Sequence, residues 1–96
     1  MVCYRYLISG RVQGAFYRAS AQHQARALGL RGWVRNLVDG RVELLACGDQ
    51  VVLDELEKWM KIGPEYAKVS NIKIIVESPK ALPENFEVRP TSSLSE

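Results

Sequence analysis

Two segments with helical periodicity divide this chain, and short segments rich in β-branched and aromatic residues flank each of them. Helices are expected at 17–28 and 51–62, and strands at 2–9, 31–37, 41–47 and 69–77, while 86–88 could add a short fifth strand. The dipeptide Asp39-Gly40 predicts a hairpin between the second and third strands. This β-α-β-β-α-β order predicts an α+β fold, a ferredoxin-like split βαβ sandwich with two helices on one face of an antiparallel sheet.

Length and composition favour one globular domain. The 96 residues are 47% hydrophobic and 25% charged, which suits a single core over residues 1–90. Residues 91–96 are polar and follow Pro90, and we expect them to form a flexible tail. No apolar run reaches the roughly 18 residues of a membrane span, and no secretory signal is visible at the N-terminus. We therefore expect a cytoplasmic protein with no membrane partner, and separately we expect a monomer.

Charge is distributed unevenly along the chain. The formal net charge is only +2, which argues against a polyanion-binding protein and hence against a nucleic-acid partner. The first 48 residues carry seven arginines and two acidic residues, whereas the second half carries six cations and nine acidic residues. Arginine offers a planar fork of donors that suits phosphate and carboxylate oxygens. The excess in the first half therefore points to a small anion, and chance clustering of surface charge is the alternative.

The two cysteines and the single histidine do not form a recognisable metal site. Cys3 and Cys47 have no cysteine or histidine at metal-ligand spacing, and His23 lies outside the apolar stripe of its helix, so no metal is expected. In the expected topology the first and third strands are antiparallel neighbours, and Cys3 opens one strand while Cys47 closes the other. A cross-strand disulfide is allowed if their Cα atoms lie within about 7 Å. Two free thiols in a reducing cytosol are the alternative.

A glycine-bearing loop leads from the first strand into the first helix and is a candidate anion site. Gly14 permits backbone conformations closed to other residues, and successive N–H groups in such a loop can converge on an anion at the helix N-terminus. Arg18 lies in the first helical turn, where an arginine opposes the helix dipole unless an anion offsets it. An ordinary connection with a surface arginine is the alternative, because the loop matches neither common nucleotide-binding glycine pattern.

Asn36 is the second candidate, because it ends the second strand just before the hairpin. The first and second strands run in the same direction in this topology, so their ends meet at one edge of the sheet. Asn36 then lies within reach of whatever the glycine loop holds, and its amide can bind a water molecule. A turn asparagine bonded to its own backbone is the alternative. Four aromatic residues are assigned to the core, namely Phe16, Trp33, Trp59 and Phe86.

At these residues the sequence resembles the acylphosphatase family. The first motif of that family, Gly-x-Val-Gln-Gly-Val-x-Phe/Tyr-Arg, appears here as Gly10-Arg11-Val12-Gln13-Gly14-Ala15-Phe16-Tyr17-Arg18. The second, Gly-x-Val-x-Asn followed by a turn and Gly-x-Val, appears as Gly32-Trp33-Val34-Arg35-Asn36 and Gly40-Arg41-Val42. The resemblance covers residues 4–89, and the joint match of both motifs at the expected separation is specific. Ala15 departs from the usual valine, so we expect somewhat weaker phosphate binding.

The resemblance implies hydrolysis of the carboxyl–phosphate bond of small acyl phosphates, without metal or cofactor. It implies that Arg18 binds the phosphoryl group with the backbone amides of Gln13, Gly14, Ala15, Phe16 and Tyr17, and that Asn36 orients the attacking water. Inorganic phosphate is then a product and a competitive inhibitor. Phosphoryl transfer needs positioning and charge neutralisation more than covalent help, and the sequence shows no Ser–His–Asp or Cys–His arrangement that would supply a nucleophile. Two alternatives keep the fold: an accessory domain that binds acyl or carbamoyl phosphate without turnover, and a nucleic-acid-binding module.

Overall fold

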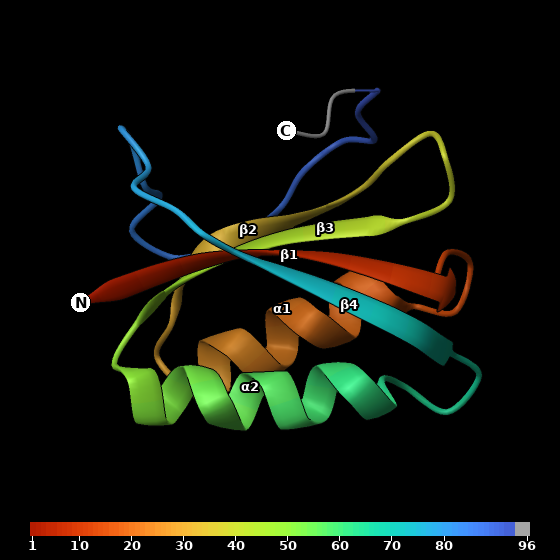
Figure 1. The fold of residues 1–96 in the computed structure, drawn as a ribbon, viewed down its shortest axis with the longest axis horizontal. Helices are drawn as coiled ribbons and strands as arrows, with labels where there is room; N and C mark the ends of the chain where they lie inside the picture. Colours follow the sequence, from red (N-terminus) through yellow and green to blue (C-terminus); the bar gives the residue numbers. More distant parts are fainter. Residues whose placement is uncertain (94–96) are drawn as a thin grey trace.

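The computed structural model describes residues 1–93 and has the expected succession of elements. Two helices lie beneath one face of a sheet (Figure 1). The elements are β1 (Val2–Arg11), α1 (Tyr17–Ala27), β2 (Arg31–Asn36), β3 (Val42–Gly48), α2 (Gln50–Ile62), β4 (Lys68–Val76) and β5 (Phe86–Val88). Every predicted boundary lies within two residues of the observed one. The predicted ferredoxin-like order of helices and strands is therefore confirmed.

The five strands form one sheet in the order β4-β1-β3-β2-β5. β1 pairs antiparallel with β3 and β4, and β2 pairs antiparallel with β3. β5 instead pairs parallel with β2, so the sheet is mixed, and the expectation of a purely antiparallel sheet is wrong at this edge. The cause is the connection 77–85, which leads from β4 at one edge to β5 at the opposite edge and reverses the chain on the way (Figure 1).

The core fills the space between the sheet and the helices. α2 buries Leu53, Leu56 and Met60, whereas α1 buries small alanines together with Tyr17. The Tyr17 hydroxyl donates a hydrogen bond of 2.8 Å to the Met60 carbonyl oxygen, which ties the start of α1 to the last turns of α2. This link fixes the helical turn that carries Arg18. Within residues 1–93, neither helix is long and apolar enough to span a membrane.

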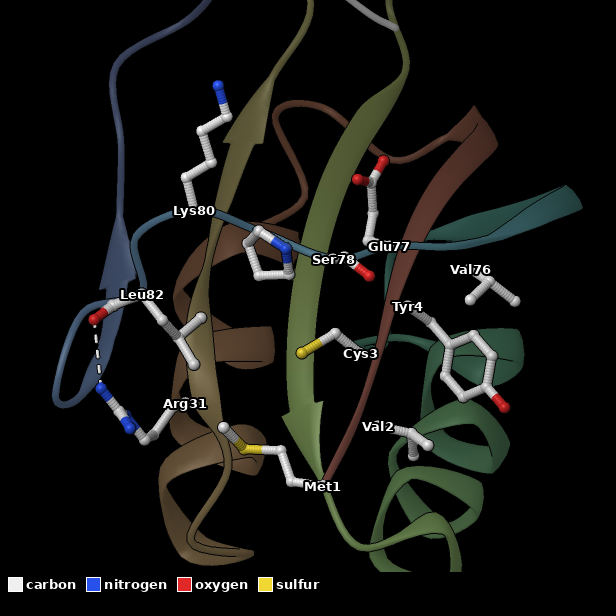
Figure 2. A pocket seen from close by; sticks show the side chains of 11 residues that line it. Met1, Val2, Cys3, Tyr4, Arg31, Val76, Glu77, Ser78, Lys80 and Leu82 are labelled. Carbon is white, nitrogen blue, oxygen red and sulfur yellow. Dashed lines mark hydrogen bonds between the residues drawn. The ribbon is translucent and has the colours of Figure 1, made fainter.

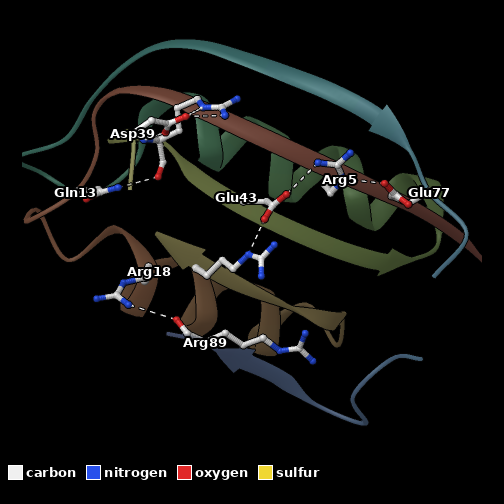
Figure 3. Close-up of polar contacts among 9 residues, drawn as sticks. Arg5, Gln13, Arg18, Asp39, Glu43, Glu77 and Arg89 are labelled. Carbon is white, nitrogen blue, oxygen red and sulfur yellow. Dashed lines mark hydrogen bonds and ion pairs between the residues drawn. The ribbon is translucent and has the colours of Figure 1, made fainter. Parts of the chain in front are cut away.

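The other face of the sheet carries a buried ion-pair network. Glu43 on β3 is 1% exposed and accepts hydrogen bonds from Arg5 at 3.0 Å and Arg35 at 2.6 Å. Arg5 also donates to Glu77 at 2.7 Å (Figure 3). Burial by itself would lower the pKa of Arg5, but its hydrogen bonds to Glu77 and Glu43 outweigh burial and raise the pKa. These ion pairs therefore link β1, β2, β3 and the start of the 77–85 connection to one another.

The C-terminal segment is partly paired with the sheet. We expected a free tail from residue 91, but the Ser92 amide donates to the Asn36 carbonyl oxygen at 2.9 Å, and the Val38 amide donates to the Ser92 carbonyl oxygen at 3.0 Å. Sequence patterns miss this contact because an isolated bridge has no periodicity. Ser92 therefore lies beside the end of β2, and residues 94–96 of the expected tail lie outside the described residues.

Cys3 and Cys47 are direct partners in the register of β1 and β3. Their Cα atoms are 4.1 Å apart, and the structure joins the two sulfur atoms. Cys3 also lines a cavity of about 440 Å³ between the N-terminus and the segment that follows β4 (Figure 2). Arg31 and Lys80 contribute positive charge to this cavity, but none of the predicted phosphate-binding residues lines it.

Candidate functional site

The connection from β1 to α1 contains two residues in the left-handed backbone region. Gly14 has φ 76°, and Phe16, which caps α1, has φ 60° and ψ 24°. A backbone of this kind, with left-handed residues on either side of Ala15, is able to direct successive N–H groups toward one side of a loop. No side chain caps the start of α1, and its first turn contains no acidic residue. The positive end of the helix is therefore left without the side-chain partners that usually occupy it.

Arg18 lies in the first turn of α1, as predicted, and is half-buried. One nitrogen of its guanidinium group donates to the Arg89 carbonyl oxygen at 3.5 Å, just beyond the end of β5 (Figure 3). A bond of this length is weak, so the guanidinium can turn its remaining donors toward an anion at little cost. The Arg89 carbonyl thus supports Arg18 without neutralising it.

Asn36 and the glycine loop share one pocket of about 270 Å³. The predicted residues that line it are Gly14, Phe16, Tyr17, Arg18 and Asn36. Asn36 ends β2, and β1 and β2 run in the same direction because each is antiparallel to β3. The sheet therefore brings the two sequence motifs together where β1 and β2 end, as expected from the topology.

Gln13 and Ala15 are not among the residues that line this pocket. The Gln13 side chain donates to the carbonyl oxygens of Leu37 at 2.6 Å and Arg41 at 2.9 Å (Figure 3). It thereby ties the loop to the hairpin that follows Asn36, a role that sequence reasoning did not foresee. The Ala15 side chain is buried, so its departure from valine concerns packing beneath the loop. For both residues only the backbone remains available to an anion.

The sequence did not indicate three apolar residues of the pocket, and the side chain of a fourth was assigned to the core. Val12, Ala19 and Val88 complete its lining. Phe16 was expected in the core but is 78% exposed, whereas Phe86 is fully buried, as predicted. Hydrophobic periodicity could not predict whether Phe16 is buried, because this residue lies between a strand and a helix and belongs to neither pattern. The sequence predicted a strand at 86–88 but did not place Val88 at the pocket, because that position depends on the parallel pairing of β5.

The pocket offers hydrogen-bond donors and positive charge, but none of the described residues that line it is a serine, cysteine or histidine that could act as a nucleophile. Arg18 is the charged residue among the described residues that line it, and none of them is a carboxylate or an imidazole. Burial raises the pKa of Tyr17, so its phenol remains a neutral donor to Met60. His23 is exposed on α1 and does not line the pocket. Such a site suits the binding of an anion and stabilisation of charge during its reaction.

Both the sequence and the fold match those of known proteins. A model of the acylphosphatase family matches residues 4–88. The chain belongs to the acylphosphatase family. An acylphosphatase of Alkalilimnicola ehrlichii is 51% identical over 86 residues, which cover 88% of this chain and 93% of that protein. An acylphosphatase of Nitrosococcus oceani is 48% identical over 90 residues, which cover 93% of this chain and 99% of that protein.

Solved acylphosphatase structures have the same fold. The crystal structure of the Bacillus subtilis acylphosphatase matches with a TM-score of 0.87 and 36% identity, covering 93% of this chain and 99% of that one. The structure of an acylphosphatase from Coxiella burnetii matches with a TM-score of 0.85 and 40% identity, covering 92% of each chain. Relatives with this degree of sequence identity and coverage favour an acylphosphatase enzyme over the nucleic-acid-binding and accessory-domain alternatives.

Proposed function

We propose that this chain hydrolyses small acyl phosphates to a carboxylate and inorganic phosphate. The observation that carries the proposal is that Gly14, Arg18 and Asn36, taken from the two family motifs, line one pocket at the start of α1. In this proposal the backbone amides of residues 13–17 and the Arg18 guanidinium bind the phosphoryl oxygens. Their combined positive field is present before the substrate arrives, so charge that develops in the transition state is stabilised without rearrangement.

Asn36 supplies the second half of the mechanism. Its amide oxygen accepts a hydrogen bond from a water molecule and directs the water oxygen at phosphorus. The bond from that oxygen to phosphorus forms as the bond from phosphorus to the carboxyl oxygen breaks. The electron pair leaves with the carboxylate, and the water gives up one proton to the phosphate product or to solvent. Because a carboxylate is a stable leaving group, neither a strong base nor a covalent intermediate is needed.

The proposal also covers the oligomeric state, the inhibitor and the partners of the enzyme. A pocket of about 270 Å³ on one chain accommodates a phosphoryl group and a small acyl group, so we expect a monomer to be active. Inorganic phosphate presents the same oxygens as the substrate and should compete with it. We propose that the enzyme acts in the cytoplasm and that it binds no nucleic acid.

Activity in the presence of a chelator tests the proposed function. The purified protein should hydrolyse acetyl phosphate and benzoyl phosphate at an unchanged rate in EDTA, because all its proposed contacts are main-chain amides, an arginine and an asparagine. Release of inorganic phosphate measures the rate. Phosphate binding without turnover would instead support the accessory domain, and activity that requires a divalent metal would contradict the mechanism.

We also propose that Cys3 and Cys47 form a disulfide in the isolated, oxidised protein. Their Cα separation of 4.1 Å is close to the range typical of bridged cysteines, and the bridge spans a sequence separation of 44 residues. Chain entropy predicts a stabilisation of about 4 kcal/mol for a loop of this size. The intact mass under non-reducing conditions should be lower than the reduced mass by two hydrogens, and the thermal midpoint should fall on reduction. Equal masses would show two free thiols.

A further inference from the structure

Phe16 is a large apolar side chain beside a polar pocket. It is 78% exposed although it directly precedes the buried Tyr17. Its φ of 60° lies in the left-handed region, which non-glycine residues enter rarely and which is enriched at functional sites. The loop thus holds this residue in an unfavourable backbone conformation and keeps it at the pocket instead of in the core.

Val88 provides a second apolar surface from β5, the edge strand beside β2. It is 41% exposed and lies on β5, where it pairs with Val34 of β2. Val88 and Phe16 line the same pocket as Arg18 and Asn36. The pocket therefore combines a polar part, made by the donors, with an apolar part that the proposed phosphoryl contacts do not use.

We propose that Phe16 and Val88 form the acyl-binding part of this pocket, so that the enzyme prefers aromatic or bulky apolar acyl phosphates to acetyl phosphate. The inference rests on the proposed function. All acyl phosphates share the phosphoryl group, so Arg18 and the loop amides cannot distinguish them. Discrimination has to come from groups that contact the acyl half, and an apolar acyl group loses water on contact with the Phe16 ring and the Val88 methyl groups.

The size of the pocket is compatible with a ring. An engineered protein cavity of about 150 Å³ holds benzene, and this pocket of about 270 Å³ is open to solvent as well. Single exposed apolar residues are common on protein surfaces and need no function. Phe16 and Val88 differ from such residues because both line the pocket that contains the proposed catalytic groups.

Two pairs of ligands test the proposal without and with turnover. The first pair is phenacylphosphonate and acetonylphosphonate, in which a methylene group replaces the bridging oxygen of benzoyl and acetyl phosphate, so that neither is hydrolysed. We expect phenacylphosphonate to inhibit with an affinity about tenfold higher than acetonylphosphonate, the lower end of what one apolar group contributes in a pocket. The second pair is the two substrates, compared by KM.

Three variants assign the preference to these residues. Phe16→Ala removes the ring but keeps the backbone amide, and Val88→Thr keeps the branched shape but adds a hydroxyl group. Each should lower the ratio of inhibitor affinities severalfold, and the double variant should bring it near one. Val51→Ala is the matched control, because Val51 is 75% exposed at the start of α2, at the end of the molecule away from the loop (Figure 1). It should leave the ratio unchanged.

The outcomes separate this inference from the proposed function. If the unaltered enzyme hydrolyses both substrates but binds the two phosphonates equally, the function stands and the acyl site is wrong. A preference that survives in both single variants and in the double variant also overturns the proposal. If neither substrate is hydrolysed and neither phosphonate binds, the proposed function itself has failed.

Discussion

Arg18→Ala should lower kcat/KM for acetyl phosphate by about 1,000-fold and should weaken inhibition by inorganic phosphate. Arginines that contact a transferring phosphoryl group contribute about this much or more. Arg18 is the charged side chain among the described residues of the pocket, so its loss leaves only the backbone donors to offset the phosphoryl charge. Steady-state kinetics with phosphate as the inhibitor measures both effects.

Two further variants make this result specific. Arg18→Lys keeps the charge but loses the fork of donors, so it should recover part of the phosphate affinity and little of the rate. Arg26→Ala removes an arginine from the last turn of the same helix, where its side chain donates to the Phe86 carbonyl oxygen at 3.1 Å. This control should keep its activity. Full turnover in Arg18→Ala would exclude Arg18 from the mechanism.

Asn36→Ala should lower kcat by about 100-fold while inorganic phosphate inhibits as well as before. Removal of one oriented amide from an active site typically has an effect of this size. Phosphate contacts the loop and Arg18 in the proposed complex, whereas Asn36 contacts the water, so rate and affinity should separate. The backbone of Asn36 keeps its bond to the Ser92 amide in this variant, so the end of β2 should be preserved.

Asn36→Asp is the matched variant for this residue. It keeps an oxygen that accepts from water but places a negative charge near the phosphoryl group, so it should weaken phosphate inhibition, unlike Asn36→Ala. Circular dichroism of both variants checks the fold. The water-orienting role is wrong if Asn36→Ala loses phosphate affinity as completely as Arg18→Ala does.

The long elements of this fold follow from the sequence because each buries a periodic apolar face. Leu53, Leu56 and Met60 recur at helical spacing along α2, and all three are buried. The three-residue β5 has too few positions to show a period, so neither its parallel pairing nor the bridge at Ser92 could be predicted. Their positions depend on the path of the 77–85 connection, which is a property of the assembled sheet.

The candidate site, like the fold, has parts that the sequence predicts and parts that it does not. Arg18 and Asn36 were predicted to meet because the directions of β1 and β2 follow from element order. The contacts that depend on side-chain rotation were not predicted, and the turn of Gln13 toward Leu37 and Arg41 is one of them. The exposure of Phe16 is another, because it results from the left-handed backbone at that residue. Hydrophobicity alone assigns such a side chain to the core.

The left-handed residues of the loop also bear on how freely this protein can vary in evolution or in the laboratory. Every residue except proline supplies a main-chain N–H donor, so the proposed phosphate cradle depends on dihedral angles more than on side-chain identity. A Cβ at Gly14 would meet no atom within 4 Å, and the restriction there is its φ of 76° alone. Substitutions that respect these angles should keep the cradle, so exchanges in the loop can alter acyl preference while phosphate recognition persists.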